Sequence, residues 1–278
     1  MDLNWMESVI YGFLSGLMDI VPLSAQAHRI LLMKFFGISG GTDVMRLAVH
    51  IGVFGGLYYS CQSQIVRINR ARALARVPKR RRKRPLDTRS LMDWSMLKTM
   101  LIPMVIGLFL YKYNTAMRDN LLLVAIFLLV NGIILYVPQF LPGSNRDSRT
   151  LTRLEGFLMG LGATASTLPG ISAVGAAVSI GSVCGVERGF CLSMALMMNL
   201  ALNLGLAIVD VFTLFTNGLG VISFGILIRY LATGLTAFGG CLLGIKIMRI
   251  LSGNHGYSGF AFYCVGLSLF TFILNLMA

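Results

Sequence analysis

Residues 16–32 (GLMDIVPLSAQAHRILL) place several chemically active side chains inside an otherwise apolar run, namely Asp19, Ser24, His28 and Arg29. A histidine can act as a base or a nucleophile, and a nearby carboxylate can orient it or hold a metal ion. An ionisable side chain at membrane depth costs about 2.5 to 3.5 kcal/mol on insertion scales. Because a helix facing lipid would not carry three of them, we expect these side chains to face protein, water or a ligand.

A related pattern recurs half a chain later, in residues 162–179 (GATASTLPGISAVGAAVS). The two patterns are Asp19-x-x-Pro22-x-Ser24 and Ser166-x-x-Pro169-x-x-Ser172. The segments Pro22-Leu23-Ser24 and Pro169-Gly170-Ile171-Ser172 are placed to begin half-helices inside the membrane. The unsatisfied N–H groups and the positive dipole end of such a half-helix bind an anion without any side chain. Gly170 would let the backbone approach the ligand closely. A phosphate-like head with an apolar tail is the ligand that such a cavity, open to lipid, implies.

The elements that must position these residues cross a membrane. Of the 278 residues, 56% are hydrophobic and 13% are charged, and the mean hydropathy is +0.76. This composition predicts an all-α polytopic membrane protein. Residues 1–6 lack a basic region, so we expect the first apolar stretch to be retained. The five cysteines have no CxxC spacing, which argues against a disulfide framework and a zinc site.

The positive charge is concentrated in one loop. The net charge is +13, and eleven of the 24 Lys and Arg residues fall between Arg67 and Arg89. On the positive-inside rule, loop 67–89 is cytoplasmic and is attracted to anionic lipid headgroups. No aromatic residues are interleaved with these charges, so we expect no nucleic-acid partner.

Two long segments, 4–36 and 154–183, are each broken by proline and glycine, and each is followed by three apolar spans. The expected spans are 44–60, 95–111, 121–141, 189–215, 219–250 and 257–277. An odd number of crossings per half would invert the second copy and bring the broken segments together near the midplane. We therefore expect one membrane domain, 1–278, with an inverted repeat (1–142 and 143–278), about six transmembrane helices and two re-entrant helix hairpins.

Three motifs carry a resemblance to a known family. They are Gly-Leu-x-acid-x-x-Pro-x-Ser-x-x-x-His at 16–28, Pro-Gly-x-Ser-x-x-Gly-Ala at 169–176 and Gly-Val-x-Arg at 185–188. Their order and separation resemble the undecaprenyl-diphosphate phosphatase family, also known as BacA or UppP, over essentially the whole chain. The resemblance implies a multi-pass protein of the bacterial inner membrane that dephosphorylates the C55 isoprenoid diphosphate to the monophosphate carrier of cell-wall synthesis. It also implies a divalent cation, Mg²⁺ or Ca²⁺, and a homodimer is compatible with the sequence.

The departures from the family pattern fall on catalytic positions. The family usually carries an E-x-x-x-E pair, where this chain has Ser15 and Asp19. A serine of the first motif is Ala25, and the arginine expected to clamp the diphosphate is Ala173. A bidentate arginine contact to phosphate is among the stronger polar contacts, so its loss predicts reduced activity. Arg29 is an additional cation that the family does not usually have.

The remaining residues predict a reduced site. We expect His28, Asp19 and Ser24 to be catalytic, with Asp19 also holding the metal ion. The headgroup would be bound by Arg29, Pro169, Gly170, Ser172, Gly175 and Arg188. Two structural alternatives stay open: His28 as a buried histidine bonded between helices, and Asp19 as an ion pair with Arg29 or His28.

For three further titratable residues we expect a structural role rather than a catalytic one. We expect His50 to be a satisfied core histidine, Asp210 to be an interfacial residue near a helix end, and His255 to be solvated.

Two other classes of function compete with the hydrolase. A non-hydrolysing transporter or flippase of polyprenyl phosphate, or of a similar anionic lipid, suits an inverted repeat with a midplane anion site. A transporter coupled to ions or protons through Asp19 and His28 is less supported, because we expect the cavity to lack a chain of titratable residues.

Overall fold

The computed structural model describes residues 4–37, 42–111, 117, 119–141, 146–217, 224–254 and 257–277; His255 therefore lies outside the described residues. The α-helices are α1 (Trp5–Ile20), α2 (Ala25–Phe35), α3 (Thr42–Ala75), α4 (Thr88–Tyr111), α6 (Leu121–Tyr136), α7 (Arg153–Thr164), α8 (Ala173–Val183), α9 (Arg188–Asn217), α10 (Phe224–Asn254) and α11 (Ser258–Met277). Short 3₁₀ helices are η1 (Lys79–Arg81), η3 (Val137–Phe140) and η4 (Ala165–Thr167). Within these ranges the fold is all-helical, as predicted, with one isolated bridge between Arg146 and Val186.

The chain is a multi-pass membrane protein. Among the described residues, five helices are long and apolar enough to cross a bilayer, within α4, α6 with η3, α9, α10 and α11. The sixth expected span, α3, has 34 residues but is too polar to qualify by composition. Its polar residues include Asp43, Arg46 and His50, and its last turns belong to the basic segment.

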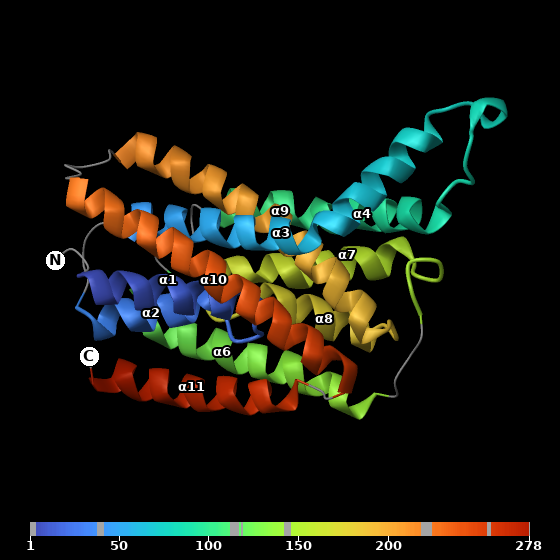
Figure 1. The fold of residues 1–278 in the computed structure, drawn as a ribbon. Coiled ribbons are helices and arrows are strands. Elements are labelled where there is room, and N and C mark those ends of the chain that lie inside the picture. The colour runs from blue at the N-terminus through green and yellow to red at the C-terminus, as the bar shows by residue number, and fades with distance from the viewer. Residues whose placement is uncertain are drawn as a thin grey trace.

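Two helix hairpins are too short to span the bilayer, because α1, α2, α7 and α8 have 16, 11, 12 and 11 residues. Figure 1 shows α1 and α2 at the end of the bundle where both termini lie, whereas α7 begins at the opposite end. The hairpins therefore enter from opposite ends. This arrangement confirms the predicted re-entrant helices.

Matching local signals begin the two hairpins. Helix α1 starts at a capping box formed by Asn4 and Glu7, and α7 starts at one formed by Thr152 and Glu155. A capping box satisfies two of the N–H groups that a helix start leaves unpaired. The returning helices are capped by the two serines of the repeated pattern, since Ser24 Oγ accepts from Ala27 N at 3.5 Å and Ser172 Oγ accepts from Gly175 N at 3.2 Å.

Each hairpin packs on a span from the other half of the chain. Gly12 and Gly16 of α1 lie against the backbone of α10, and Gly160 of α7 lies against the backbone of α4. A side chain at these positions would collide with that backbone, so glycines four residues apart permit the close approach. The exchange of partners is what an inverted duplication predicts. The division at 142/143 falls beside residues outside the described part and stays a prediction.

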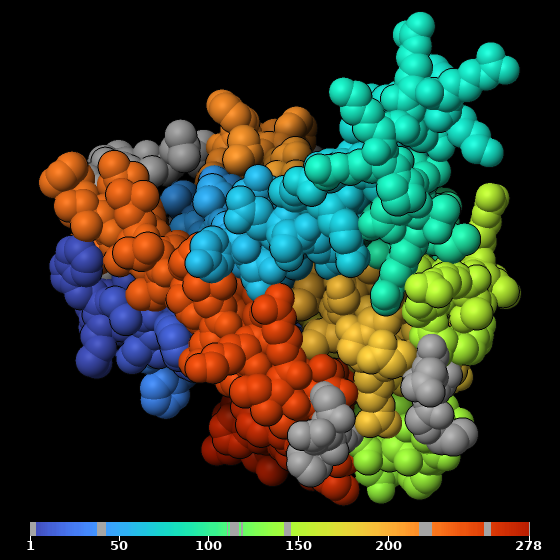
Figure 2. Space-filling model, turned by 45° about the vertical axis from the view of Figure 1, so that its right-hand side comes forward, coloured from blue at the N-terminus to red at the C-terminus, as the bar shows by residue number. Residues whose placement is uncertain are grey.

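The basic arm, residues 67–89, extends beyond the helix bundle (Figure 2). It is fixed at its base by an ion pair of 3.1 Å between Arg67 and Asp93, and Arg72 lies over the ring of Trp94 at 4.0 Å. These two contacts join the base of the arm to α4.

Candidate active site between the hairpin tips

The two hairpin tips are bonded to a common residue, Asn131 of α6. Its Nδ2 donates to the carbonyl of Pro22 at 3.1 Å, and its Oδ1 accepts from the backbone N–H of Ser172 at 3.0 Å. Gln26 Nε2 also donates to the carbonyl of Ser166 at 2.8 Å, directly from one tip to the other. The tips thus meet inside the bundle, as predicted.

The glycines of the second tip make this meeting possible. A Cβ atom at Gly175 would lie 2.6 Å from Cβ of Pro22. Gly170 has φ +137°, a conformation that other residues rarely adopt, and lies against the backbone of α6. Pro169, Gly170 and Gly175 do not line the cavity described next, so their predicted headgroup contacts stay predictions.

A small cavity lies between the tips and α9. Its polar lining residues are Asp19, Gln26, Arg29, Ser166, Ser172 and Asn199. Ala25 and Ala173 also face it. The cavity therefore gathers an acid, a cation and the start of α8, whose first residue is Ala173.

Asp19 is held by two amides rather than by a cation. Its Oδ2 accepts from Asn199 Nδ2 at 2.8 Å and from Asn203 Nδ2 at 3.0 Å. No ion pair joins Asp19 to Arg29 or His28 in the part of the chain that the structure describes, so that structural alternative is wrong. Neither asparagine was predicted as a site residue, although two amides four residues apart in an apolar span are a usable signal.

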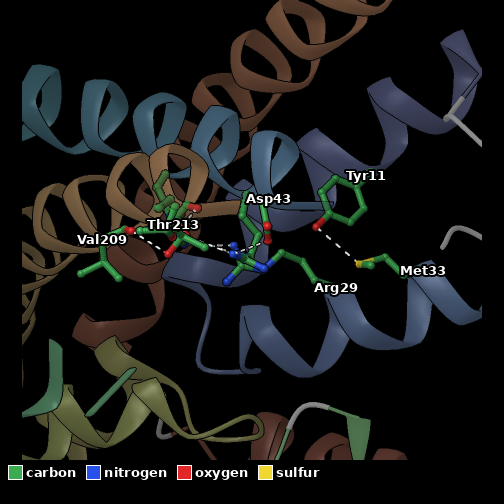
Figure 3. A network of polar contacts seen from close by, with 10 residues as sticks. Tyr11, Arg29, Met33, Asp43, Val209 and Thr213 are labelled. Carbon is green, nitrogen blue, oxygen red and sulfur yellow. Dashed lines mark hydrogen bonds and ion pairs between the residues drawn. The ribbon is translucent and has the colours of Figure 1, made fainter. Parts of the chain in front are cut away.

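Arg29 of α2 points toward Asp43 of α3 (Figure 3). Its guanidinium joins a buried network of side chains from α3 and α9. Its Nη1 lies 3.2 Å from His50 Nε2, and His50 Nδ1 lies 2.6 Å from Asp210 Oδ2. Asp210 Oδ1 accepts from both Nε and Nη2 of Arg46 at 3.3 Å. His50 is thus a satisfied core histidine, as predicted. The interfacial position expected for Asp210 is wrong, because its side chain is fully buried between these partners.

This network also corrects the expectation that the cavity lacks a chain of titratable residues. Asp210, His50 and Arg29 form such a chain behind the cavity. It does not make a proton path, however, because a guanidinium has no acceptor and does not deprotonate in proteins. Asp210 and His50 therefore hold the guanidinium of Arg29 in position.

His28 lies on another side of α2. Its Nδ1 is 2.9 Å from the carbonyl of Ser24, and its Nε2 is 2.9 Å from Oη of Tyr263. Because a carbonyl only accepts, Nδ1 carries the proton and Nε2 accepts from the tyrosine. His28 borders an apolar cleft formed with α6 and α11. The structure does not bring it together with Asp19, and the buried interhelical alternative describes its position.

Two other predicted residues also lie outside the cavity lining. Ser24 is buried at the first tip with φ +65°, where its hydroxyl caps α2. Arg188 begins α9 and donates from Nη2 to the carbonyl of Pro138 at 3.4 Å. Their catalytic and headgroup roles stay predictions.

A family model described as "Bacitracin resistance protein BacA" matches residues 8–270, which includes both hairpin tips and all the residues of the cavity. The chain belongs to the BacA family. Among its relatives is an undecaprenyl-diphosphatase of Renibacterium salmoninarum, 26% identical over 98% of this chain and 96% of that protein. Another, from Methanobrevibacter smithii, is 25% identical over 95% and 96%. A third, from Desulforapulum autotrophicum, is 24% identical over 98% and 99%, and both carry the same name as the first.

In this BacA-family chain Asp19 is the acid of the cavity that could contact a divalent cation. Within the described ranges, no three His, Cys, Asp or Glu side chains form a metal-binding group. Asn199 and Asn203 turn their amide nitrogens to Asp19, and Asn199 Oδ1 accepts from Asn203 Nδ2 at 3.1 Å. Asn203 Oδ1 is buried without a hydrogen-bond partner in the described part of the chain. Mg²⁺ is commonly held by one or two carboxylates together with substrate phosphates, which a single acid at Asp19 fits.

Proposed function

We propose that this chain hydrolyses a polyprenyl diphosphate to the monophosphate, the activity that its relatives' name, undecaprenyl-diphosphatase, describes. The observation that carries the proposal is the cavity between the hairpin tips. It holds one carboxylate and one guanidinium at membrane depth, in a chain that matches the family from residue 8 to 270. Groups this costly to bury in a membrane are retained for a ligand.

The lining supports binding of the diphosphate head. Arg29 offers a cation, and α8 begins at the same cavity, so its positive dipole end would face an anion bound there. In the reaction, water adds to the terminal phosphorus, the bridging P–O bond breaks, and inorganic phosphate and one proton leave the lipid monophosphate. Such transfers depend mainly on positioning and on cations near the phosphoryl oxygens.

Asp19 is the residue we assign to a divalent cation, through its Oδ1 atom. The ion would neutralise charge on the diphosphate. The amide donors of the two asparagines both engage Oδ2, which fixes the carboxylate and leaves Oδ1 without a hydrogen bond in the described part. The protein therefore contributes an acid, Asp19, and a cation, Arg29, that both line the cavity.

We further infer a bacterial inner membrane location, with loop 67–89 in the cytoplasm. The basic arm and the start of α7 lie at the same end of the bundle (Figure 1). Arg146, Arg149 and Arg153 belong to the segment that leads into α7, so the positive-inside rule supports this orientation. The homodimer stays a prediction that a single chain does not test. The flippase is not favoured, since the relatives are named for hydrolysis.

The test is phosphate release from undecaprenyl diphosphate by the purified protein in detergent, with Mg²⁺ or Ca²⁺ and with a chelator. We expect cation-dependent release that Asp19→Asn lowers at least roughly a hundredfold and that His28→Ala lowers less. An equal loss in both variants would return His28 to the site. Saturable lipid binding with no release in the native chain would overturn the hydrolase in favour of a carrier.

A further inference from the structure

The guanidinium of Arg29 is buried but largely unpaired. The residue is 5% exposed and lines the cavity between the hairpin tips. A guanidinium has five N–H donors, and in the described part of the chain only one contact, from Nη1 to His50 Nε2, engages them. No carboxylate there lies within ion-pair distance of Arg29. A buried cation with free donors needs an anion to complete it.

The group that holds Arg29 is neutral, and the geometry fixes its proton. Because the guanidinium only donates, His50 Nε2 must accept, and His50 Nδ1 therefore carries the proton that it donates to Asp210. Asp210 cannot turn toward Arg29, because its other oxygen accepts from Arg46, which in turn pairs with Asp43 at 2.7 Å. The carboxylate thus orients the cation through an imidazole without neutralising it by contact.

This arrangement leaves the remaining donors of Arg29 for the cavity. Two parallel N–H groups of a guanidinium match two oxygens of one phosphate, and such contacts are stronger than neutral hydrogen bonds. We propose that Arg29 is the oxyanion-binding residue of the cavity and that His50 and Asp210 are its positioning residues. The ligand class is a phosphate or diphosphate oxyanion, either free or at the head of a lipid. The inference rests on the proposed function only for the lipid's identity.

The first experiment measures binding rather than turnover, by titrating the purified protein with inorganic pyrophosphate and, separately, with undecaprenyl diphosphate. We expect Arg29→Gln to weaken both affinities by roughly tenfold to a hundredfold, the range expected for charge-assisted contacts. Arg249→Gln is the matched control, since Arg249 bonds to Ser60 outside the cavity, and it should bind as the native chain does. Loss for the lipid alone would assign the site to the lipid headgroup rather than to free phosphate.

The second experiment tests the positioning residues with matched variants. His50→Gln keeps an acceptor that can face Arg29, whereas His50→Leu removes it. We expect His50→Leu to raise KM more than it lowers kcat, His50→Gln to recover most of the loss, and Asp210→Asn to fall between them. Thermal unfolding of each variant separates misfolding from a binding defect.

The two experiments test the oxyanion site and the proposed hydrolysis separately. Weakened binding in Arg29→Gln, in a native chain that releases no phosphate, would retain the oxyanion site and remove the proposed reaction. Native-like binding of both ligands by a folded Arg29→Gln variant would overturn the inference even if hydrolysis is observed. Equal behaviour of His50→Gln and His50→Leu would remove the positioning role.

Discussion

The hairpin of α1 and α2 supplies the charged side chains of the cavity, whereas the hairpin of α7 and α8 supplies alanine and hydroxyl-bearing residues. Asp19 and Arg29 come from the first, and Ser166, Ser172 and Ala173 from the second. Both hairpins nevertheless begin at a capping box and return from a serine cap. The comparison teaches that the geometry of the two hairpins is set by caps and glycines, and that the charge is a separate property carried by one of them.

The largest expected effect is on phosphate release, and it compares the acid of the first hairpin, Asp19, with the hydroxyl at the matching position of the second, Ser166. Asp19→Asn should lower phosphate release at least roughly a hundredfold, as expected when a group acting on developing charge is removed. Ser166→Ala, at the corresponding place in the second hairpin, should lower it only a few-fold, because its backbone carbonyl still accepts from Gln26. Initial rates with undecaprenyl diphosphate measure both. Similar losses would show that the two hairpins share the chemistry.

The next effect tests whether glycine contacts set the geometry of both hairpins. Gly16→Ala and Gly160→Ala should each cost about 1 to 3 kcal/mol or more, because the new methyl group meets the backbone of α10 or α4. Gly156→Ala should change stability by less than about 1 kcal/mol, since its neighbour is the end of the flexible Met96 side chain and alanine favours the helix. Thermal unfolding in detergent provides the comparison. A large cost at Gly156 would contradict the packing described here.

A smaller effect is expected when charge is added to the second hairpin. Ala173→Arg places a cation across the cavity from Arg29 and should tighten pyrophosphate binding roughly tenfold, which corresponds to about 1.4 kcal/mol. The same change in an Arg29→Gln background should restore part of the lost affinity. Ala173→Gln is the control for side-chain size. Equal binding by the Arg and Gln variants would mean that position 173 does not meet the headgroup.

The smallest effect distinguishes the two serine caps. Ser24 has φ +65°, so Ser24→Gly relieves backbone strain while losing the cap and should leave stability within about 1 kcal/mol. Ser172 has φ −94°, and Ser172→Gly loses the cap without relief. We therefore expect a lower unfolding temperature for Ser172→Gly than for Ser24→Gly. The reverse order would show that Ser24 is not strained.

The sequence predicted the hairpins because their signals are local. Proline, glycine and serine at fixed spacing predict a broken helix and its cap, and this is why Ser24 and Ser172 begin the returning helices as expected. Contacts across the bundle were not predicted, since the bond from Asn131 to both tips and the bond from His28 to Tyr263 depend on which faces of distant helices meet. A polar residue in an apolar span signals a partner but does not name it.

The helical period would have improved one prediction. Ala25 and Arg29, four residues apart, face the cavity together, while His28 points to the neighbouring cleft. The motif predicted a chemical role for His28 but did not predict which side of α2 its side chain lies on. Asp210 was misjudged for a related reason, because its position near a helix end did not reveal that α3 covers it with His50 and Arg46.

The contact between α1 and α10 has a consequence for how the chain is made. Gly12 and Gly16 are synthesised long before the backbone that they pack against, at Thr233 and Ala237. Until then the first hairpin, with Asp19 and Arg29 on it, is in the membrane without its main neighbour. Long-range closure of this kind slows folding and leaves polar groups exposed to lipid in the meantime. All the residues that line the cavity, the last of which is Leu206 of α9, are therefore made before the helix that supports the first hairpin.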